Sequence, residues 1–132
     1  MAPEHTEGLR TLDAGRADAL ERICELIVPG SARVGPVVYI DALLTAMPEA
    51  VRAGFLDAID ELGELARGGA DALAPHAHTP AFLGLRALAV EAFYSDFVAP
   101  GRDTEGAWDE IDFHPRAAAF LEKDWSYLGI SG

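Results

Sequence analysis

The residues best suited to metal or acid–base chemistry are four histidines, His5, His76, His78 and His114. Two of them lie two residues apart in the stretch "PHAHTP". Zinc sites in proteins use three or four ligands, and neither a CxxC nor an HExxH pattern accompanies this pair. The pair therefore indicates a surface loop in preference to a zinc site. Because His114 directly precedes Pro115, we expect a turn residue there and not a catalytic base.

A second candidate is the acidic stretch "RDTEGAWDEIDFHP" at residues 102–115, which could bind a cation. Its carboxylates are Asp103, Glu105, Asp109, Glu110 and Asp112. The helix–loop–helix calcium pattern needs Gly at its sixth position and Glu at its twelfth. Counted from Asp103, those positions hold Trp108 and His114. We therefore expect a solvated acidic loop.

Nucleophilic and phosphate chemistry find little support. The chain's four serines, at positions 31, 95, 126 and 131, lie outside any GxSxG elbow. The stretch "PGSARVG" has glycines but lacks the Lys-Ser/Thr pair and the preceding strand of a phosphate loop. Tyr94 or Asp96 could transfer a proton, but the sequence names no partner for either. The lone Cys24 lies in an apolar helical stripe, which predicts a buried thiol.

Charge narrows the possible partners. The 132-residue chain has 10 basic and 22 acidic residues, a net charge of -12. Phosphate backbones would be repelled, so binding to nucleic acid or to an anionic membrane is disfavoured. No apolar run reaches the roughly 18 residues needed to span a bilayer. Basic protein surfaces remain as partners.

The elements that would position these residues are all helical. Asp13 caps a predicted helix that ends at Val28 before Pro29-Gly30, and Pro36 starts a second. A third predicted helix begins after Pro48 and ends at Gly68-Gly69, and a turn-rich segment spans 70–79. Thr79 caps a fourth predicted helix, which runs to about Val98. A short helix is expected over 116–125. The periodicity predicts one all-α domain over 1–132, of four to five helices, with a flexible N-terminus (1–11) and a loop-rich C-terminal third (101–132).

The fourth predicted helix differs from the others. Between Ala81 and Phe97 only Gly84, Arg86, Glu91, Ser95 and Asp96 are neither apolar nor aromatic. A helix that is apolar nearly all round is expected to be buried on most sides. It is therefore predicted either to be the central helix or to meet a partner as well.

Aromatic residues gather in the last third of the chain. Eight of the eleven lie within 35 residues, namely Phe93, Tyr94, Phe97, Trp108, Phe113, Phe120, Trp125 and Tyr127. For Phe93 and Phe97 a place in the core is favoured. For Trp108, Trp125 and Tyr127, core and interface are equally open, because Trp and Tyr bury a large ring while keeping a polar atom satisfied.

Four segments, "LERICELIVPGS", "GPVVYIDALL", "EAFYSD" and "GAW", resemble the gluconate 2-dehydrogenase subunit 3 family in order and spacing. The resemblance covers residues 18–47 and 88–112, roughly half the chain. It implies an all-helical small subunit without flavin that packs on a large FAD-containing subunit of the glucose–methanol–choline oxidoreductase type. That partner would oxidise sugars, sugar acids or other alcohols.

The positions that match the family pattern are Pro29, Gly30, Tyr94, Ser95, Asp96, Gly106 and Trp108. Three features depart from it. The twin-arginine leader common in the family is not seen, which favours a cytoplasmic complex, or a periplasmic one if the natural chain begins earlier. The family's Gly-Gly-Asn is replaced by "APGRDTE", and the tail from His114 onward has no match.

The resulting expectation is a subunit that binds a partner and has no catalytic residue, metal or cofactor of its own. The aromatic helix end would hold the Trp108 loop, and loop and tail would present rings to the larger subunit. The expected partner-binding residues are Tyr94, Asp96, Phe97, Trp108, Trp125 and Tyr127. Two alternatives stay open: a stand-alone helical adaptor, and a small enzyme with a pocket lined by Tyr94, His114 and acidic residues.

Overall fold

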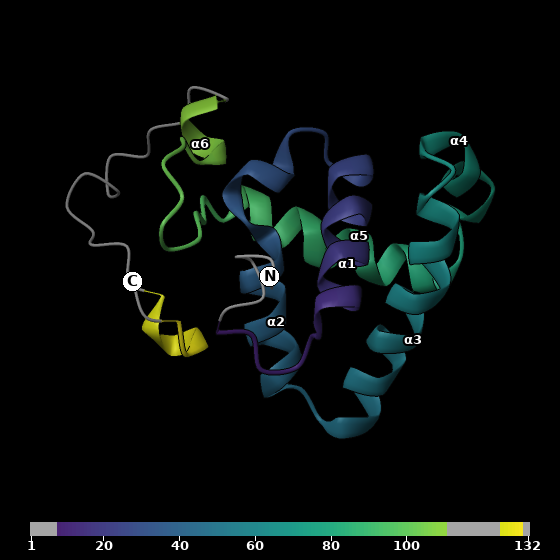
Figure 1. Cartoon of the computed structure of the whole chain (residues 1–132), viewed down its shortest axis with the longest axis horizontal. Helices are drawn as coiled ribbons and strands as arrows, with labels where there is room; N and C mark the ends of the chain where they lie inside the picture. Colours follow the sequence, from purple (N-terminus) through teal and green to yellow (C-terminus); the bar gives the residue numbers. More distant parts are fainter. Residues whose placement is uncertain (1–7, 111–124, 131–132) are drawn as a thin grey trace.

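The computed structural model of the chain describes residues 8–110 and 125–130, and within them it is all-α without a strand. The helices in chain order are α1 (Ala14–Ile27), α2 (Pro36–Ala46), α3 (Glu49–Ala66), α4 (Ala70–Leu73), α5 (Pro80–Tyr94) and α6 (Ala107–Glu110) (Figure 1). Short 3₁₀ turns cover Ser31–Val34, Ala74–His76 and Ser126–Leu128. The predicted all-α fold class is confirmed.

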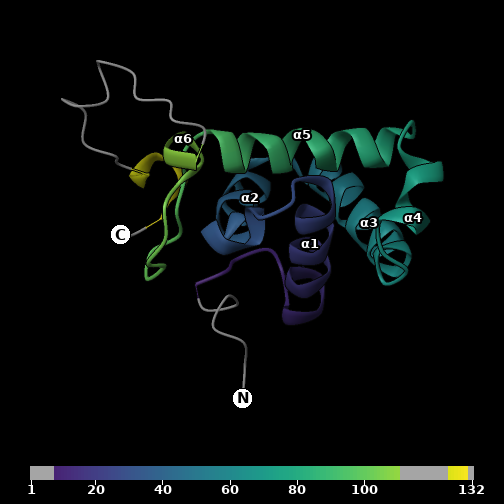
Figure 2. The same cartoon turned by 90° about the horizontal axis from the view of Figure 1, so that it is seen from above.

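The helices form two layers. Helices α2, α1 and α3 lie side by side, and α5 crosses over all three, contacting each of them (Figure 2). The core between the layers is built from aliphatic side chains, of which Leu20, Ile40, Ile59 and Leu85 are completely buried. A helix laid across three others buries one of its faces and leaves the other uncovered.

The four long helices begin where their capping residues predict. Asp13 accepts a hydrogen bond from the Arg16 N–H at the start of α1, and Thr79 accepts one from the Phe82 N–H at the start of α5. Pro36 occupies the first turn of α2, as its fixed φ favours. α3 begins at Glu49, directly after Pro48. These starts are decided within a few residues of each cap, which is why the sequence predicts them.

The end of α5 corrects the prediction. The helix was expected to run to about Val98, but it ends at Tyr94. Its last turn tightens, because the Ser95 N–H bonds the Glu91 carbonyl while the Asp96 N–H bonds the Phe93 carbonyl. Asp96 then adopts a left-handed φ of 65°, which no helix can continue.

Three further expectations change. The segment 70–79, predicted as turns, contains α4 and a 3₁₀ turn. Trp108, expected in a loop, lies in α6. α5 is an outer helix and is not buried on most sides, since Leu83 and Tyr94 are exposed. The predicted short helix over 116–125 lies, apart from Trp125, outside the described residues.

Several core predictions are confirmed. Phe93 and Phe97 are 2% and 0% exposed, so both rings close the core. Cys24 is fully buried, and that burial raises the pKa of its thiol to about 12. A thiol with so high a pKa stays protonated at neutral pH and is a poor nucleophile.

Candidate functional site

The segments that carry the family resemblance come together at one end of the molecule. In the first segment, "LERICELIVPGS", Glu25 bonds the backbone that follows its own helix. Its carboxylate accepts the Gly30 N–H at 2.6 Å and the Ala32 N–H at 3.0 Å. The buried Ser31 hydroxyl donates to the Cys24 carbonyl at 3.0 Å. These bonds hold the Pro-Gly stop that follows α1 in one conformation.

This connector packs against the aromatic end of α5. The Arg33 guanidinium lies 5.1 Å from the centre of the Phe93 ring, in cation–π range. The Ala99 N–H donates to the Val34 carbonyl at 2.8 Å. A Cβ on Gly35 would stand 2.7 Å from the Ala99 Cβ, so this approach requires glycine. The connector and the stretch after α5 therefore form one unit.

The residues around Asp96 form what we call the Asp96 latch, made of Tyr94, Asp96, Gly106 and Trp108. Asp96 Oδ1 accepts the Trp108 backbone N–H at 3.1 Å, which supplies a partner for an N–H in the first turn of α6. The Trp108 indole Nε1 donates to the Tyr94 carbonyl at 3.0 Å, at the open end of α5. A side chain on Gly106 would overlap the Asp96 carboxylate, so the latch closes only with glycine at that position.

A second group, the tail cluster, consists of Tyr39, Phe97, Trp125 and Tyr127. The Trp125 ring stands edge-on to Phe97 at 5.2 Å between centroids and to Tyr39 at 6.2 Å, and Tyr127 follows it at 6.4 Å. Burial first, and then the neighbouring Glu91 carboxylate, raises the pKa of the Tyr39 hydroxyl. Tyr39 therefore remains neutral at physiological pH and acts as a packing ring.

The expected partner-binding residues differ widely in exposure. Phe97 is fully buried and Asp96 is 3% exposed, so neither presents its side chain at the surface. Trp108 and Trp125 are half-buried. Tyr94 and Tyr127 are 46% and 71% exposed. Of the six expected residues, Tyr94 and Tyr127 expose the largest share of their side chains to a partner, and partner binding by any of them stays a prediction.

Of Tyr94 and Asp96, the two residues that could transfer a proton, Asp96 has its side chain in a hydrogen bond within the fold. Its Oδ1 accepts the Trp108 backbone N–H. Over residues 8–110 and 125–130 there is no group of three or more His, Cys, Asp or Glu side chains that could hold a metal ion. His114, the other polar residue of the enzyme alternative, lies outside the described residues.

Two polar residues anchor the backbone in a way that the sequence analysis did not predict. Asp41 is 2% exposed and accepts three backbone N–H groups, from Arg10, Thr11 and Leu12, each at 2.9 Å. Its place between Ile40 and Ala42 in an apolar helix was the available signal, since a buried carboxylate needs several donors. Glu25, the second anchor, gave no such signal because it falls on the polar side of its helix.

Comparison with protein-family models, with curated proteins and with solved structures finds no match to this chain. Within the described residues, none of the helices has both the length and the apolar character needed to cross a membrane.

Proposed function

We propose that the chain is a non-catalytic small subunit that binds and stabilises a large FAD-dependent oxidoreductase subunit oxidising sugars or other alcohols. In this proposal the flavin belongs to the large subunit, and the small subunit contributes a docking surface. The proposal starts from the resemblance to the gluconate 2-dehydrogenase subunit 3 family.

The Asp96 latch is the observation that carries the proposal. The segments "EAFYSD" and "GAW" are apart in sequence, yet Asp96 and Trp108 contact each other across twelve positions. Gly106 is the residue that the contact requires. One contact thus accounts for three of the matched positions, Asp96, Gly106 and Trp108. This supports treating the matched pattern as a single structural feature.

The chemistry of the buried carboxylates also supports an accessory role. Asp41 and Asp96 each accept backbone N–H groups, so their negative charges stabilise turns and helix ends. An acid–base catalyst instead needs a side chain within reach of its substrate. The exposed rings of Tyr94 and Tyr127 suit protein contact, because aromatic side chains dominate the energetics of interfaces.

Co-expression with an FAD-dependent oxidoreductase of the glucose–methanol–choline type tests the proposal, and a neighbouring reading frame that encodes such a flavoprotein would supply the partner. We expect the two chains to co-elute in size-exclusion chromatography, with flavin absorbance in the shared peak. Withholding the small chain should leave the flavoprotein less stable or less active. If the flavoprotein is fully active without the small chain and the two elute separately, the proposal fails.

The runner-up is a stand-alone helical adaptor, favoured by the net charge of -12, which suits a basic partner of any kind. The same experiment separates the two functions. An adaptor would elute without flavin even when the flavoprotein is present in excess.

A further inference from the structure

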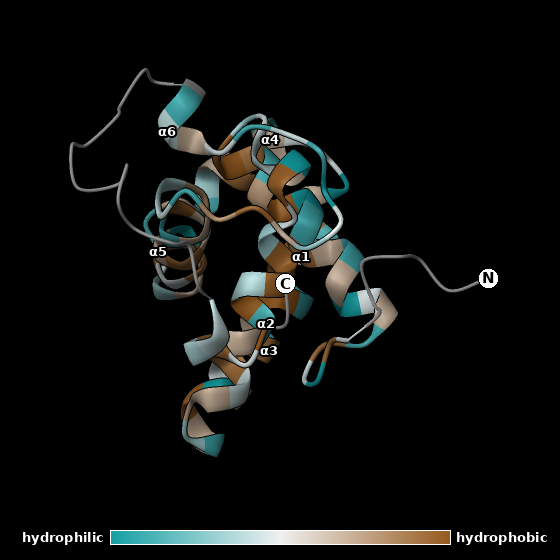
Figure 3. Cartoon of the chain, turned by 90° about the vertical axis from the view of Figure 1, so that its left-hand side faces the viewer, coloured by the Kyte–Doolittle hydropathy of each residue, from teal (hydrophilic) through white to brown (hydrophobic). Residues whose placement is uncertain are grey.

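Helix α5 has one covered face and one open face. The inner face packs on the layer below through Leu85, Leu88, Ala89, Ala92 and Phe93, all buried. Figure 3 looks nearly along α5 and shows the helix at the margin of the fold, as Figure 2 does from above. The described part of the chain covers α5 from one side.

The open face carries apolar residues where polar ones are expected. Leu83, Ala87, Val90 and Tyr94 are spaced by four, three and four residues, which places them in one stripe about 16 Å long. Leu83 is 49% exposed and Tyr94 46%, Ala87 is exposed, and Val90 is half-buried. We call this stripe the α5 outer face. A surface helix in a monomer would place polar residues along such a stripe.

The stripe continues into α6, and acidic residues border it there. The Trp108 indole is fixed to the Tyr94 carbonyl, so the half-buried Trp108 ring adjoins the end of the stripe. Glu91 on α5, Glu105 before α6 and Asp109 in α6 are exposed around this end. The surface is therefore an apolar strip with an acidic border at its Trp108 end, and the exposed Arg86 lies beside its middle.

The charge decides which occupant fits the strip. A second copy would bring another net charge of -12 and, on α5, Arg86 as its single basic residue. An acidic border is complemented by Lys and Arg, and like charges brought together cost affinity. A different protein, apolar at its centre and basic at its edge, fits better than a second copy.

We propose that the α5 outer face, extended by Trp108, is the surface on which the large subunit docks. The facing surface of that subunit is apolar where it meets Leu83, Ala87 and Tyr94, and it places Lys or Arg side chains opposite the acidic border. This inference rests on the proposed function and specifies where the contact is made.

The test compares variants in which aspartate replaces exposed apolar residues, either on the α5 outer face or on α3. The double variant Leu83→Asp/Ala87→Asp puts carboxylates into the strip, and Val51→Asp puts one on α3, where Val51 is 48% exposed. We expect the double variant to raise the dissociation constant for the flavoprotein at least about thirtyfold, and Val51→Asp to change it less than about twofold. Circular dichroism checks that both variants fold.

Salt provides a second readout. Because the border acts through charge, the wild-type dissociation constant should rise about fivefold from low to high ionic strength. An affinity that is insensitive to salt would overturn the charge part of the inference.

The other outcomes separate the inference from the proposed function. If the wild-type chain does not bind the flavoprotein, the proposed function fails and the inference with it. If wild type and double variant bind equally well, the docking surface is wrong and the proposed function stands. If the purified wild-type chain is a dimer that Leu83→Asp/Ala87→Asp dissociates, a second copy occupies the strip and the inference is overturned.

Discussion

Three carboxylates, the buried Asp41 and Asp96 and the half-buried Glu25, bind backbone N–H groups. Asp41 accepts three of them, Glu25 accepts two, and Asp96 accepts one at the start of α6. A carboxylate removed from water loses its hydration, and these donors replace it. Each carboxylate fixes the backbone of a segment that joins or follows a helix, so these residues determine the loop conformations at the surface of the bundle.

Asp41 is the residue whose loss should be felt most. Asp41→Ala leaves three N–H groups of residues 10–12 without their acceptor, and we expect it to lower the free energy of unfolding by about 3 kcal/mol. Asp41→Asn keeps one acceptor oxygen and should cost less than Asp41→Ala. Urea unfolding of the three proteins checks the order. Equal stability of Asp41→Ala and wild type would contradict the anchoring role.

Two substitutions of Asp96 test its hydrogen bond to the Trp108 N–H and its left-handed backbone conformation. Asp96→Ala removes the acceptor for the Trp108 N–H and places alanine at a φ of 65°, so we expect a loss of about 2 kcal/mol. Asp96→Asn keeps an acceptor oxygen, and asparagine tolerates this φ, so it should restore most of the loss. Urea unfolding gives the stabilities, and tryptophan fluorescence reports whether the Trp108 environment changes. If Asn and Ala behave alike, the latch is not what holds α6.

At the scale of elements, the sequence predicts the features that nearby residues decide. It misses the features that depend on contacts between residues far apart in the chain. The starts of the four long helices depend on caps within a few residues, so Asp13, Pro36 and Thr79 were enough to place three of them. The end of α5 was not predicted, because Asp96 stops the helix with a left-handed φ, and its carboxylate contacts Trp108, twelve positions further along the chain. The core positions expected for Phe93 and Phe97 are confirmed. For Trp125 core and interface were equally open, and its contacts with Tyr39 and Phe97 could not be deduced.

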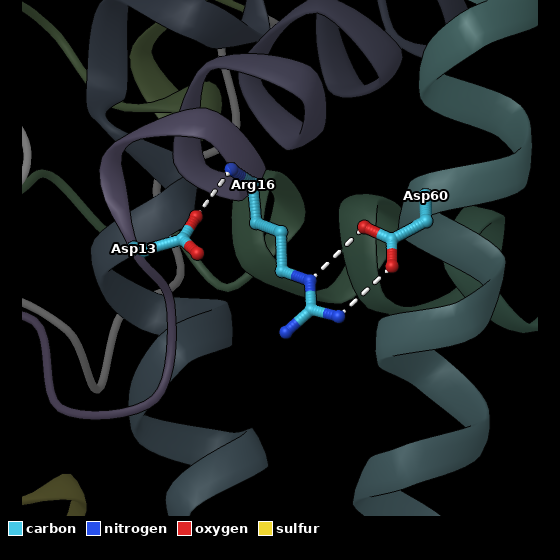
Figure 4. A network of polar contacts seen from close by, with 3 residues as sticks. All are labelled: Asp13, Arg16 and Asp60. Atoms are coloured by element: carbon cyan, nitrogen blue, oxygen red, sulfur yellow. Dashed lines mark hydrogen bonds and ion pairs between the residues drawn. The ribbon is translucent and has the colours of Figure 1, made fainter.

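Helices α1 and α3 are joined at the surface by an ion pair (Figure 4). Arg16 donates from Nε to Asp60 Oδ1 at 3.0 Å and from its terminal nitrogen to Oδ2 at 2.8 Å. The hydrogen-bonded Arg16 guanidinium holds the pKa of the Asp60 carboxyl below its usual value. Asp60 is 51% exposed, so solvent screens the pair and its contribution is about 0.5 kcal/mol.

The Arg16–Asp60 ion pair makes the free energy of unfolding depend on pH, and the lowered pKa of Asp60 gives the direction of that dependence. Since the folded-state pKa of Asp60 is depressed, its contribution is present above the unfolded pKa, about 4, and disappears as pH falls through the lower folded value. We expect Asp60→Asn to lower the free energy of unfolding by about 0.5 kcal/mol at neutral pH and to have no effect well below about pH 3. Urea unfolding at both pH values measures this. Glu64→Gln, at the exposed and longer Arg67 contact of 3.9 Å, is the control and should change little at either pH.

At the scale of the whole molecule, the two ends of the described chain are held together. The Arg10 guanidinium donates to the Leu128 carbonyl at 2.9 Å, across 118 positions. Residues 126–128 contact α2, and the Trp125 ring packs on Tyr39 and Phe97. The stretch 125–130 therefore belongs to the fold. Its two aromatic residues differ in exposure, since Trp125 is half-buried and Tyr127 is exposed.

This division leads to a prediction about the tail cluster. Trp125→Ala removes a half-buried ring that stands 5.2 Å from Phe97, so it should lower the free energy of unfolding by about 2 kcal/mol. Tyr127→Ala removes a ring that is 71% exposed and should change stability by less than about 0.5 kcal/mol. Urea unfolding measures both, and titration of the flavoprotein measures a second effect. On the proposed function, Tyr127→Ala weakens the complex about tenfold although the chain stays fully folded. A loss of stability without a loss of affinity in Tyr127→Ala would instead assign that ring to the core, and the partner would then have to be held by the α5 outer face without the tail.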